Sequence, residues 1–103
     1  MSGRIETLQS ILAQEPGNRL ARYGLAMEYG NTGRLEEAVA EYRALIGTHP
    51  DYAYAYFHCG QTLERMGQKD EARAIYRQGV EAAARSGDAH ARSEIEGALD
   101  LLA

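Results

Sequence analysis

The chain has 103 residues, of which 45% are hydrophobic and 25% charged, and its formal net charge is -4. This length suits a single domain, and the apolar fraction is too high for an intrinsically disordered chain. The negative charge and the single lysine, Lys69, argue against nucleic acid as the main partner, because phosphate binding needs clustered basic side chains.

Two further features of the composition concern the cellular compartment. The chain begins with a polar, amphipathic stretch and contains no apolar run of transmembrane length, so we expect neither a signal peptide nor contact with a membrane. Its one cysteine, Cys59, cannot form an internal disulfide. Both observations favour a cytoplasmic protein.

Turn signals divide the chain into six stretches of helical length. Apolar residues recur in these stretches at three- and four-residue spacing, which places one hydrophobic stripe along each helix. The pattern predicts helices at residues 2–15, 19–32, 35–48, 52–66, 69–85 and 88–102.

The start of the fourth stretch gives a conflicting signal. Aromatic and small residues alternate from Tyr52 to Tyr56, as they would in a β-strand. A helix is nevertheless favoured, because alanine is a poor strand former, Asp51 is a candidate N-cap, and the residues after Tyr56 continue with helical spacing.

An internal repeat is the strongest feature of the sequence. The pattern Gly33-x3-Glu37-Ala38-x-Ala40-x-Tyr42-Arg43 returns as Gly67-x3-Glu71-Ala72-x-Ala74-x-Tyr76-Arg77, 34 residues later. This is the period of a helix-turn-helix unit that stacks on copies of itself to bury its apolar face.

The motif residues resemble the tetratricopeptide repeat (TPR) family, whose pattern runs W-x2-L-G-x2-Y in the first helix and A-x3-F with a closing P in the second. In the first copy the matching residues are Leu25, Ala26, Tyr29, Ala38, Tyr42 and Pro50, with Arg22 in the usual tryptophan position. In the second copy they are Tyr56, Cys59, Gly60, Leu63, Ala72 and Tyr76, with Ala84 in place of proline.

The resemblance implies an all-α fold in which antiparallel helix-turn-helix repeats stack as a short right-handed α-solenoid. We expect one domain, divided into an N-terminal half-repeat (1–16), two TPR units (19–52 and 53–86) and a C-terminal capping helix (87–103). Ala26 against Ala38, and Gly60 against Ala72, would let paired helices approach closely, while Tyr42 and Tyr76 would fill the space towards the neighbouring unit.

The sequence offers little support for catalysis or for a bound metal. Adjacent residues on a helix point about 100° apart, so His58 and Cys59 are poorly placed to share one metal ion, and Cys59 occupies an apolar motif position. No serine or cysteine has an assignable base, and no glycine-rich phosphate loop is present. We therefore expect a non-enzyme without cofactor or metal.

The family resemblance instead implies a protein that binds other proteins, and periodicity identifies the face of each repeat's first helix that would line the groove. The predicted peptide-binding residues are Leu20, Tyr23, Met27, Asn31, Tyr54, Phe57, His58, Gln61 and Arg65. In one interpretation these rings only fill the space between helices. In the other they anchor a peptide or partner segment, apolar or aromatic in character.

A self-association module is the alternative function, because about three repeats are usually needed for independent stability and a homodimer could cover surface that two repeats leave exposed. The groove has too few basic side chains to hold an acidic chain terminus, so we expect an apolar or aromatic ligand.

Overall fold

The computed structural model describes residues 3–102 and, within that range, contains six α-helices and no strand. The helices are α1 (Gly3–Gln14), α2 (Arg19–Asn31), α3 (Leu35–Thr48), α4 (Ala53–Arg65), α5 (Lys69–Ser86) and α6 (Ala89–Leu101). Each lies within a residue or two of its predicted position, although the predicted start of the first helix, at residue 2, lies outside the described residues. The all-α prediction is confirmed.

Local sequence explains where the helices begin and end. The side chain of Asn18 accepts a hydrogen bond from the Ala21 amide at 3.0 Å and so caps α2. Gly33 and Gly67 follow α2 and α4 with φ of 80° and 77°, a left-handed conformation that glycine adopts without the strain other residues would incur. Because these glycines are one repeat apart, the same turn recurs in both repeats.

The alternating segment from Tyr52 to Tyr56 is helical from Ala53 onward, as predicted. The prediction of Asp51 as its N-cap is wrong. The cap position belongs to Tyr52, whose side chain makes no capping hydrogen bond. The Asp51 carboxylate instead accepts a hydrogen bond from Arg85 Nε at 2.8 Å, so it ties the loop before α4 to the end of α5.

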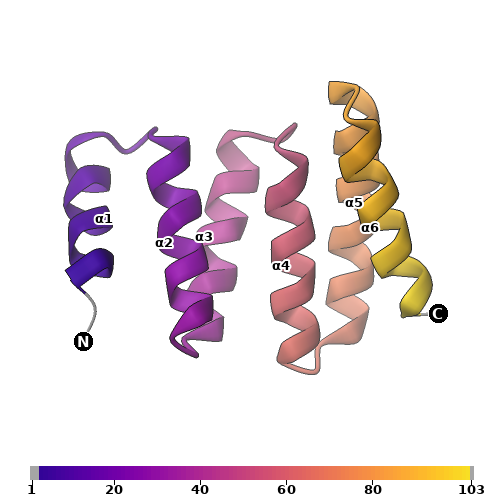
Figure 1. Cartoon of the computed structure of the whole chain (residues 1–103), viewed down its shortest axis with the longest axis horizontal. Coiled ribbons are helices and arrows are strands. Elements are labelled where there is room, and N and C mark those ends of the chain that lie inside the picture. Colours follow the sequence, from indigo (N-terminus) through magenta and orange to yellow (C-terminus); the bar gives the residue numbers. More distant parts are fainter. Residues whose placement is uncertain (1–2, 103) are drawn as a thin grey trace.

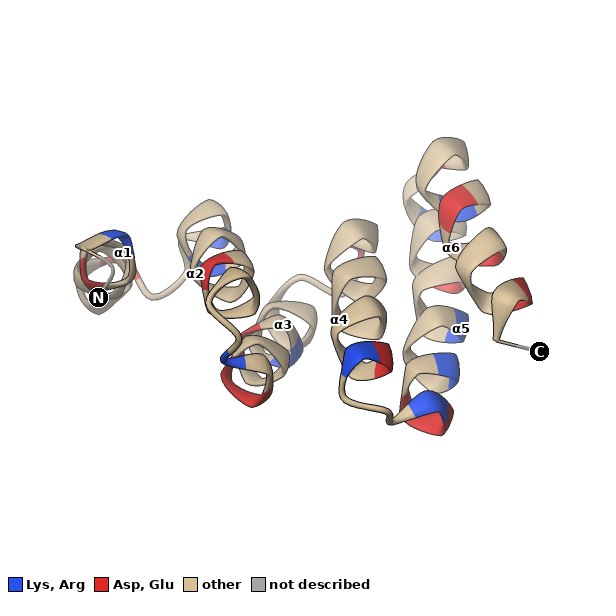
Figure 2. Ribbon diagram, turned by 60° about the horizontal axis from the view of Figure 1, so that its bottom comes forward, with Lys and Arg blue, Asp and Glu red and all other residues tan. Residues whose placement is uncertain are grey.

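Consecutive helices pack antiparallel against each other from α1 to α6 (Figure 1). α2, α4 and α6 lie in front in this view, and α3 and α5 lie behind them. In the turned view α3 lies below α2, and α5 lies beside α4 (Figure 2). The core lies between the packed helices, and its largest fully buried side chains are Tyr76, Leu45, Leu63, Ile95 and Cys59.

The contact between α4 and α5 depends on two glycines, each covered by a tyrosine of the other helix. A Cβ atom added to Gly60 would lie 2.6 Å from two ring carbons of Tyr76, and one added to Gly79 would lie 2.7 Å from Cβ of Tyr56. The close approach at Gly60 is confirmed, but its predicted partner is wrong: the Tyr76 ring, and not Ala72, lies nearest to it, so Tyr76 fills space within its own repeat. Each missing side chain leaves room for an aromatic residue.

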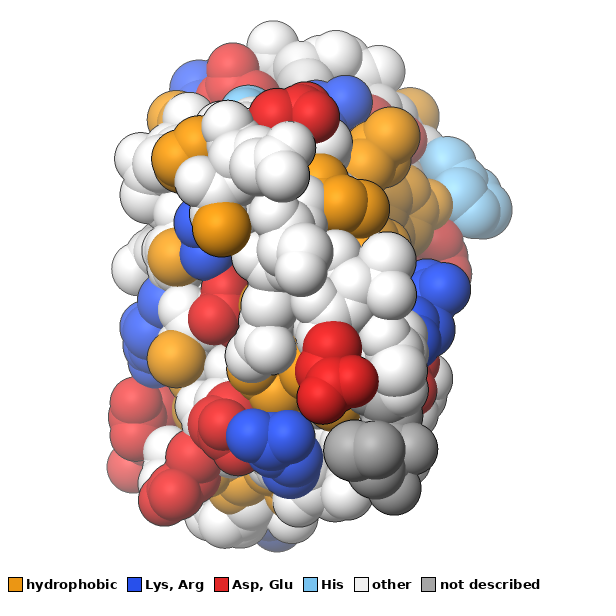
Figure 3. Space-filling view, turned by 90° about the vertical axis from the view of Figure 1, so that its left-hand side faces the viewer, with side chains coloured by type: hydrophobic (Ala, Val, Ile, Leu, Met, Phe, Trp, Pro, Cys, Tyr) orange, Lys and Arg blue, Asp and Glu red, His pale blue; other side chains and the backbone are white. Residues whose placement is uncertain are grey.

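Within the described part of the chain, the α1 end of the stack has no large hydrophobic patch in the view of Figure 3. Hydrophobic side chains appear there as scattered small groups between charged side chains and uncoloured atoms (Figure 3). Among the described residues, no helix is both long and apolar enough to cross a membrane.

Candidate groove face

The surface formed by α2, α4 and α6 above α3 and α5, called the groove face below, has a hollow on each side of α4. A further pocket, lined by Gln61, Glu64 and Arg65, lies on α4 itself. The α2–α4 hollow has a volume of about 270 Å³, and the α4–α6 hollow about 390 Å³. Tyr42 of α3 lines the first hollow, and Tyr76 of α5 lines the second. These two tyrosines are one repeat apart, so the hollows are repeated features of the solenoid.

The α2–α4 hollow contains five of the nine predicted groove residues. Its lining consists of Met27, Gly30, Asn31, Tyr42, His58, Gln61, Thr62 and Arg65. The Arg65 guanidinium donates to the Gly30 carbonyl at 3.3 Å, which joins α4 to α2 across the hollow. This lining offers amide and guanidinium donors but no carboxylate.

The α4–α6 hollow has a different chemical character. Its lining consists of Phe57, Gln61, Glu64, Tyr76, Glu94, Ala98 and Leu101. Gln61 lines both hollows and therefore stands between them. Tyr54 lies beside the second hollow, where its ring contacts Phe57 and its hydroxyl donates to Glu94 Oε1 at 2.8 Å. This hydrogen bond raises the pKa of the Tyr54 phenol to about 12.

Aromatic rings connect the two hollows across α4. The His58 ring lies 5.6 Å from that of Tyr23 and 5.4 Å from that of Phe57, measured between centroids. Phe57 in turn lies 6.5 Å from Tyr76. Burial lowers the pKa of His58, since the neutral imidazole is favoured among these rings. Ring packing is thus part of the role of these residues, while the side chains of His58 and Phe57 also line the hollows.

Three predicted groove residues line neither hollow: Tyr54, which lies beside the second hollow, and Tyr23 and Leu20 of α2. Tyr23 packs its ring against Tyr42, Tyr52 and His58, and burial raises its pKa to about 12. Leu20 is 72% exposed at the start of α2 and lines neither hollow. Periodicity places both residues on the groove side of α2 but cannot show which of them opens onto a cavity.

The sequence analysis missed five residues that line the α4–α6 hollow, of which Tyr76 was predicted only to fill space towards the neighbouring unit. Glu64 lies seven residues after Phe57 on the same helical face, a spacing that could have identified it. Glu94, Ala98 and Leu101 belong to α6, which the sequence indicated only as a cap.

Cys59 has the structural role that the sequence predicted. It is fully buried, and burial raises the pKa of its thiol to about 11. Within residues 3–102, no three His, Cys, Asp or Glu side chains gather closely enough to hold a metal ion.

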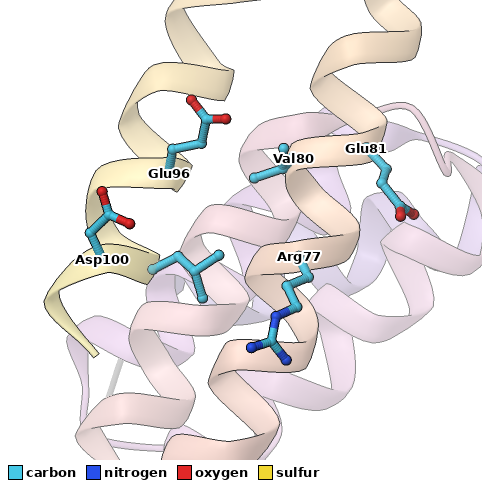
Figure 4. A pocket seen from close by; sticks show the side chains of 6 residues that line it. Arg77, Val80, Glu81, Glu96 and Asp100 are labelled. Atoms are coloured by element: carbon cyan, nitrogen blue, oxygen red, sulfur yellow. The ribbon is translucent and has the colours of Figure 1, made fainter. Parts of the chain in front are cut away.

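A third hollow, of about 540 Å³, lies between α5 and α6 and is separate from the groove face. Glu96 and Asp100 project from α6 and Arg77 from α5, beside the apolar groups of Val80 and Leu99 (Figure 4). This hollow is at the α6 end of the stack, where a further helix would pack in a longer solenoid.

The stacked antiparallel helices, with hollows lined by Tyr42 and Tyr76 one repeat apart, define the class of protein as the helical repeat proteins. A sequence model of the tetratricopeptide repeat family matches residues 23–89. A TPR repeat-containing protein of Pseudomonas aeruginosa is 31% identical over 91 residues, which cover 88% of this chain and 87% of that protein. The chain therefore belongs to the tetratricopeptide repeat family.

Solved structures support the same assignment. The crystal structure of a TPR domain protein from Salinibacter ruber superposes with a TM-score of 0.77 at 33% identity, over 82% of this chain and 94% of that one. The solution structure of a Bordetella parapertussis protein gives a TM-score of 0.83 at 30% identity, over 99% of this chain and 89% of that one. TPR domains are generally protein–protein interaction modules rather than catalysts, and one fold serves many different partners.

Proposed function

We propose that this chain binds a segment of another protein along its groove face, mainly through aromatic and apolar contacts. One observation carries the proposal: both hollows open on the same face, one repeat apart, and share Gln61 as a common wall. An extended or helical segment that crosses Gln61 would contact both hollows. Phe57 and Tyr54 offer rigid contact area at the second hollow.

The α6 end of the stack favours this proposal over self-association. The residues 34 positions after buried Cys59, Gly60 and Leu63 are Ser93, Glu94 and Gly97, all of them exposed. α6 therefore does not repeat the buried positions of α4. This supports the interpretation of α6 as a cap.

Peptide selection against the immobilised chain, followed by calorimetric titration of the enriched peptides, tests the proposal. Replacing Tyr54 and Phe57 together by alanine should weaken binding by about 2 kcal/mol if they are central anchors. Gln61→Trp, a change at an exposed position, should also block the face without altering the core. Circular dichroism establishes that each variant is folded.

The matched control truncates two apolar residues of the α5–α6 hollow, Val80 and Leu99, to alanine and should leave affinity unchanged. Binding that survives both groove-face variants but is lost in this control would place the site elsewhere and refute the proposal. Light scattering over a concentration series tests the alternative, because a concentration-dependent dimer that excludes the peptide would favour self-association.

A further inference from the structure

The α4–α6 hollow combines two carboxylates with an apolar wall, an arrangement that the α2–α4 hollow lacks. Glu64 comes from α4, and Glu94 faces the same hollow from α6. Phe57 and Leu101 supply the apolar surface, and Leu101 is 88% exposed, so this surface is not covered by the chain itself.

Neutral or weakly basic groups contact the two carboxylates. Glu64 accepts a hydrogen bond from the Tyr76 hydroxyl. Glu94 accepts one from the Tyr54 hydroxyl, and His90 Nε2 lies 3.1 Å from it. Within residues 3–102, no arginine or lysine forms an ion pair with either carboxylate, and none lines this hollow.

The nearest arginine in the sequence, Arg65, lines a small pocket on α4 together with Gln61 and Glu64, but among the ion pairs of residues 3–102 it is not joined to Glu64. Arg65 follows Glu64 directly, but its guanidinium donates to the Gly30 carbonyl on the far side of α4. Arg65 lines the α2–α4 hollow and not the α4–α6 hollow, whereas both carboxylates line the α4–α6 hollow. The α4–α6 hollow is therefore the more acidic of the two.

Arginine is the side chain that matches an apolar wall next to two carboxylates. Its methylene groups can pack on apolar surface while the guanidinium remains at the rim. The guanidinium forms charge-assisted hydrogen bonds with carboxylates and stacks on aromatic rings such as that of Phe57. Lysine offers a single, strongly hydrated charge and stacks less well.

We propose that the α4–α6 hollow binds an arginine side chain of the partner segment, flanked by an apolar residue that contacts Leu101. This inference rests on the proposed function and adds to it a ligand chemistry and a position along the groove face. The partner segment lies with its arginine over α4 and α6 rather than over α2.

The test uses a capped peptide, acetyl-Gly-Ser-Leu-Arg-Leu-Gly-Ser-amide, and the same peptide with citrulline in place of arginine. Citrulline keeps the shape of the side chain and removes its charge. In titrations of the ¹⁵N-labelled full chain followed by NMR, we expect the arginine peptide to bind about tenfold more tightly than the citrulline peptide. Its affinity should fall as salt is added. The shifted amides should lie in α4 and α6.

Replacing both Glu64 and Glu94 by glutamine should remove the preference for arginine, because glutamine still accepts the tyrosine hydrogen bonds but carries no charge. The control replaces Glu6 and Glu36, which are exposed on α1 and α3, by glutamine and changes the net charge equally. We expect this control to bind both peptides as the unmodified chain does.

The inference is overturned if the unmodified chain binds the two peptides with equal affinity or shows no saturable binding. It is also overturned if the amide shifts are confined to α2, or if the two glutamine variants lose equal amounts of affinity for the arginine peptide. The comparison of peptides on the unmodified chain does not depend on the folding of any variant. If selected peptides bind the groove face without an arginine preference, this inference fails and the proposed function stands. If no segment binds that face, the proposed function fails as well.

Discussion

Gly60→Ala is expected to destabilise the protein, although the same change in most helices would stabilise it. Alanine is favoured over glycine in a helix interior by about 1 kcal/mol. Here the added methyl would lie 2.6 Å from Cδ1 and Cζ of Tyr76, closer than carbon atoms can approach. The Tyr76 ring is fully buried and bonded to Glu64, so it cannot move aside cheaply. With an overpacking cost near the upper end of about 1 to 3 kcal/mol, we expect a net loss of about 2 kcal/mol.

Urea unfolding followed by circular dichroism measures this change, with Gly97→Ala as the matched control. A Cβ at Gly97, on exposed α6, would meet no atom within 4 Å, so this variant should gain up to about 1 kcal/mol. Replacing Tyr76 by leucine removes the ring, and in that background Gly60→Ala should cost much less than it does alone. Equal shifts for the two glycine variants, or a cost at Gly60 that is independent of Tyr76, would refute the argument.

Three further predictions concern the core and its titratable groups. Ala72→Leu and Ala38→Leu should each lower the free energy of unfolding by about 1 to 3 kcal/mol, because both alanines are fully buried. Ala13→Leu, at an exposed position of α1, should have little effect. Coincident urea midpoints for the three variants would contradict this prediction. Cys59, buried and with a pKa of about 11, should react with iodoacetamide at least about a hundredfold more slowly in the native than in the urea-unfolded chain, as mass spectrometry can measure. The pKa of His58 in the folded chain is lower than its ordinary value of 6.5. As the pH falls below 6.5, His58 is therefore protonated in the unfolded chain before it is protonated in the folded chain, and the free energy of unfolding declines. His58→Gln should therefore flatten the decline in urea midpoint between about pH 7 and pH 5.5, and an unchanged slope would assign the decline to other groups.

The candidate site shows how far periodicity alone can predict a surface. Met27, Asn31, His58, Gln61 and Arg65 follow the spacing of a helical face, and all five line the α2–α4 hollow. A helical stripe is a local property, so the sequence is sufficient to identify it. Which residues of the stripe open onto a cavity depends on neighbouring helices, which explains why Tyr23 was included although its ring packs against three others.

The sequence by itself determined the six helices, the 34-residue repeat and the family, because these depend on hydrophobic spacing and turn residues within short stretches of chain. Tertiary structure decided what lies opposite each residue. Gly60 could be recognised as a close contact, but only the packing of α5 on α4 shows that the Tyr76 ring fills its place. Likewise, Glu64 and Glu94 are 30 residues apart in the sequence and share a hollow only because α6 folds back beside α4. Long-range juxtaposition depends on how whole helices pack, and no local pattern records it.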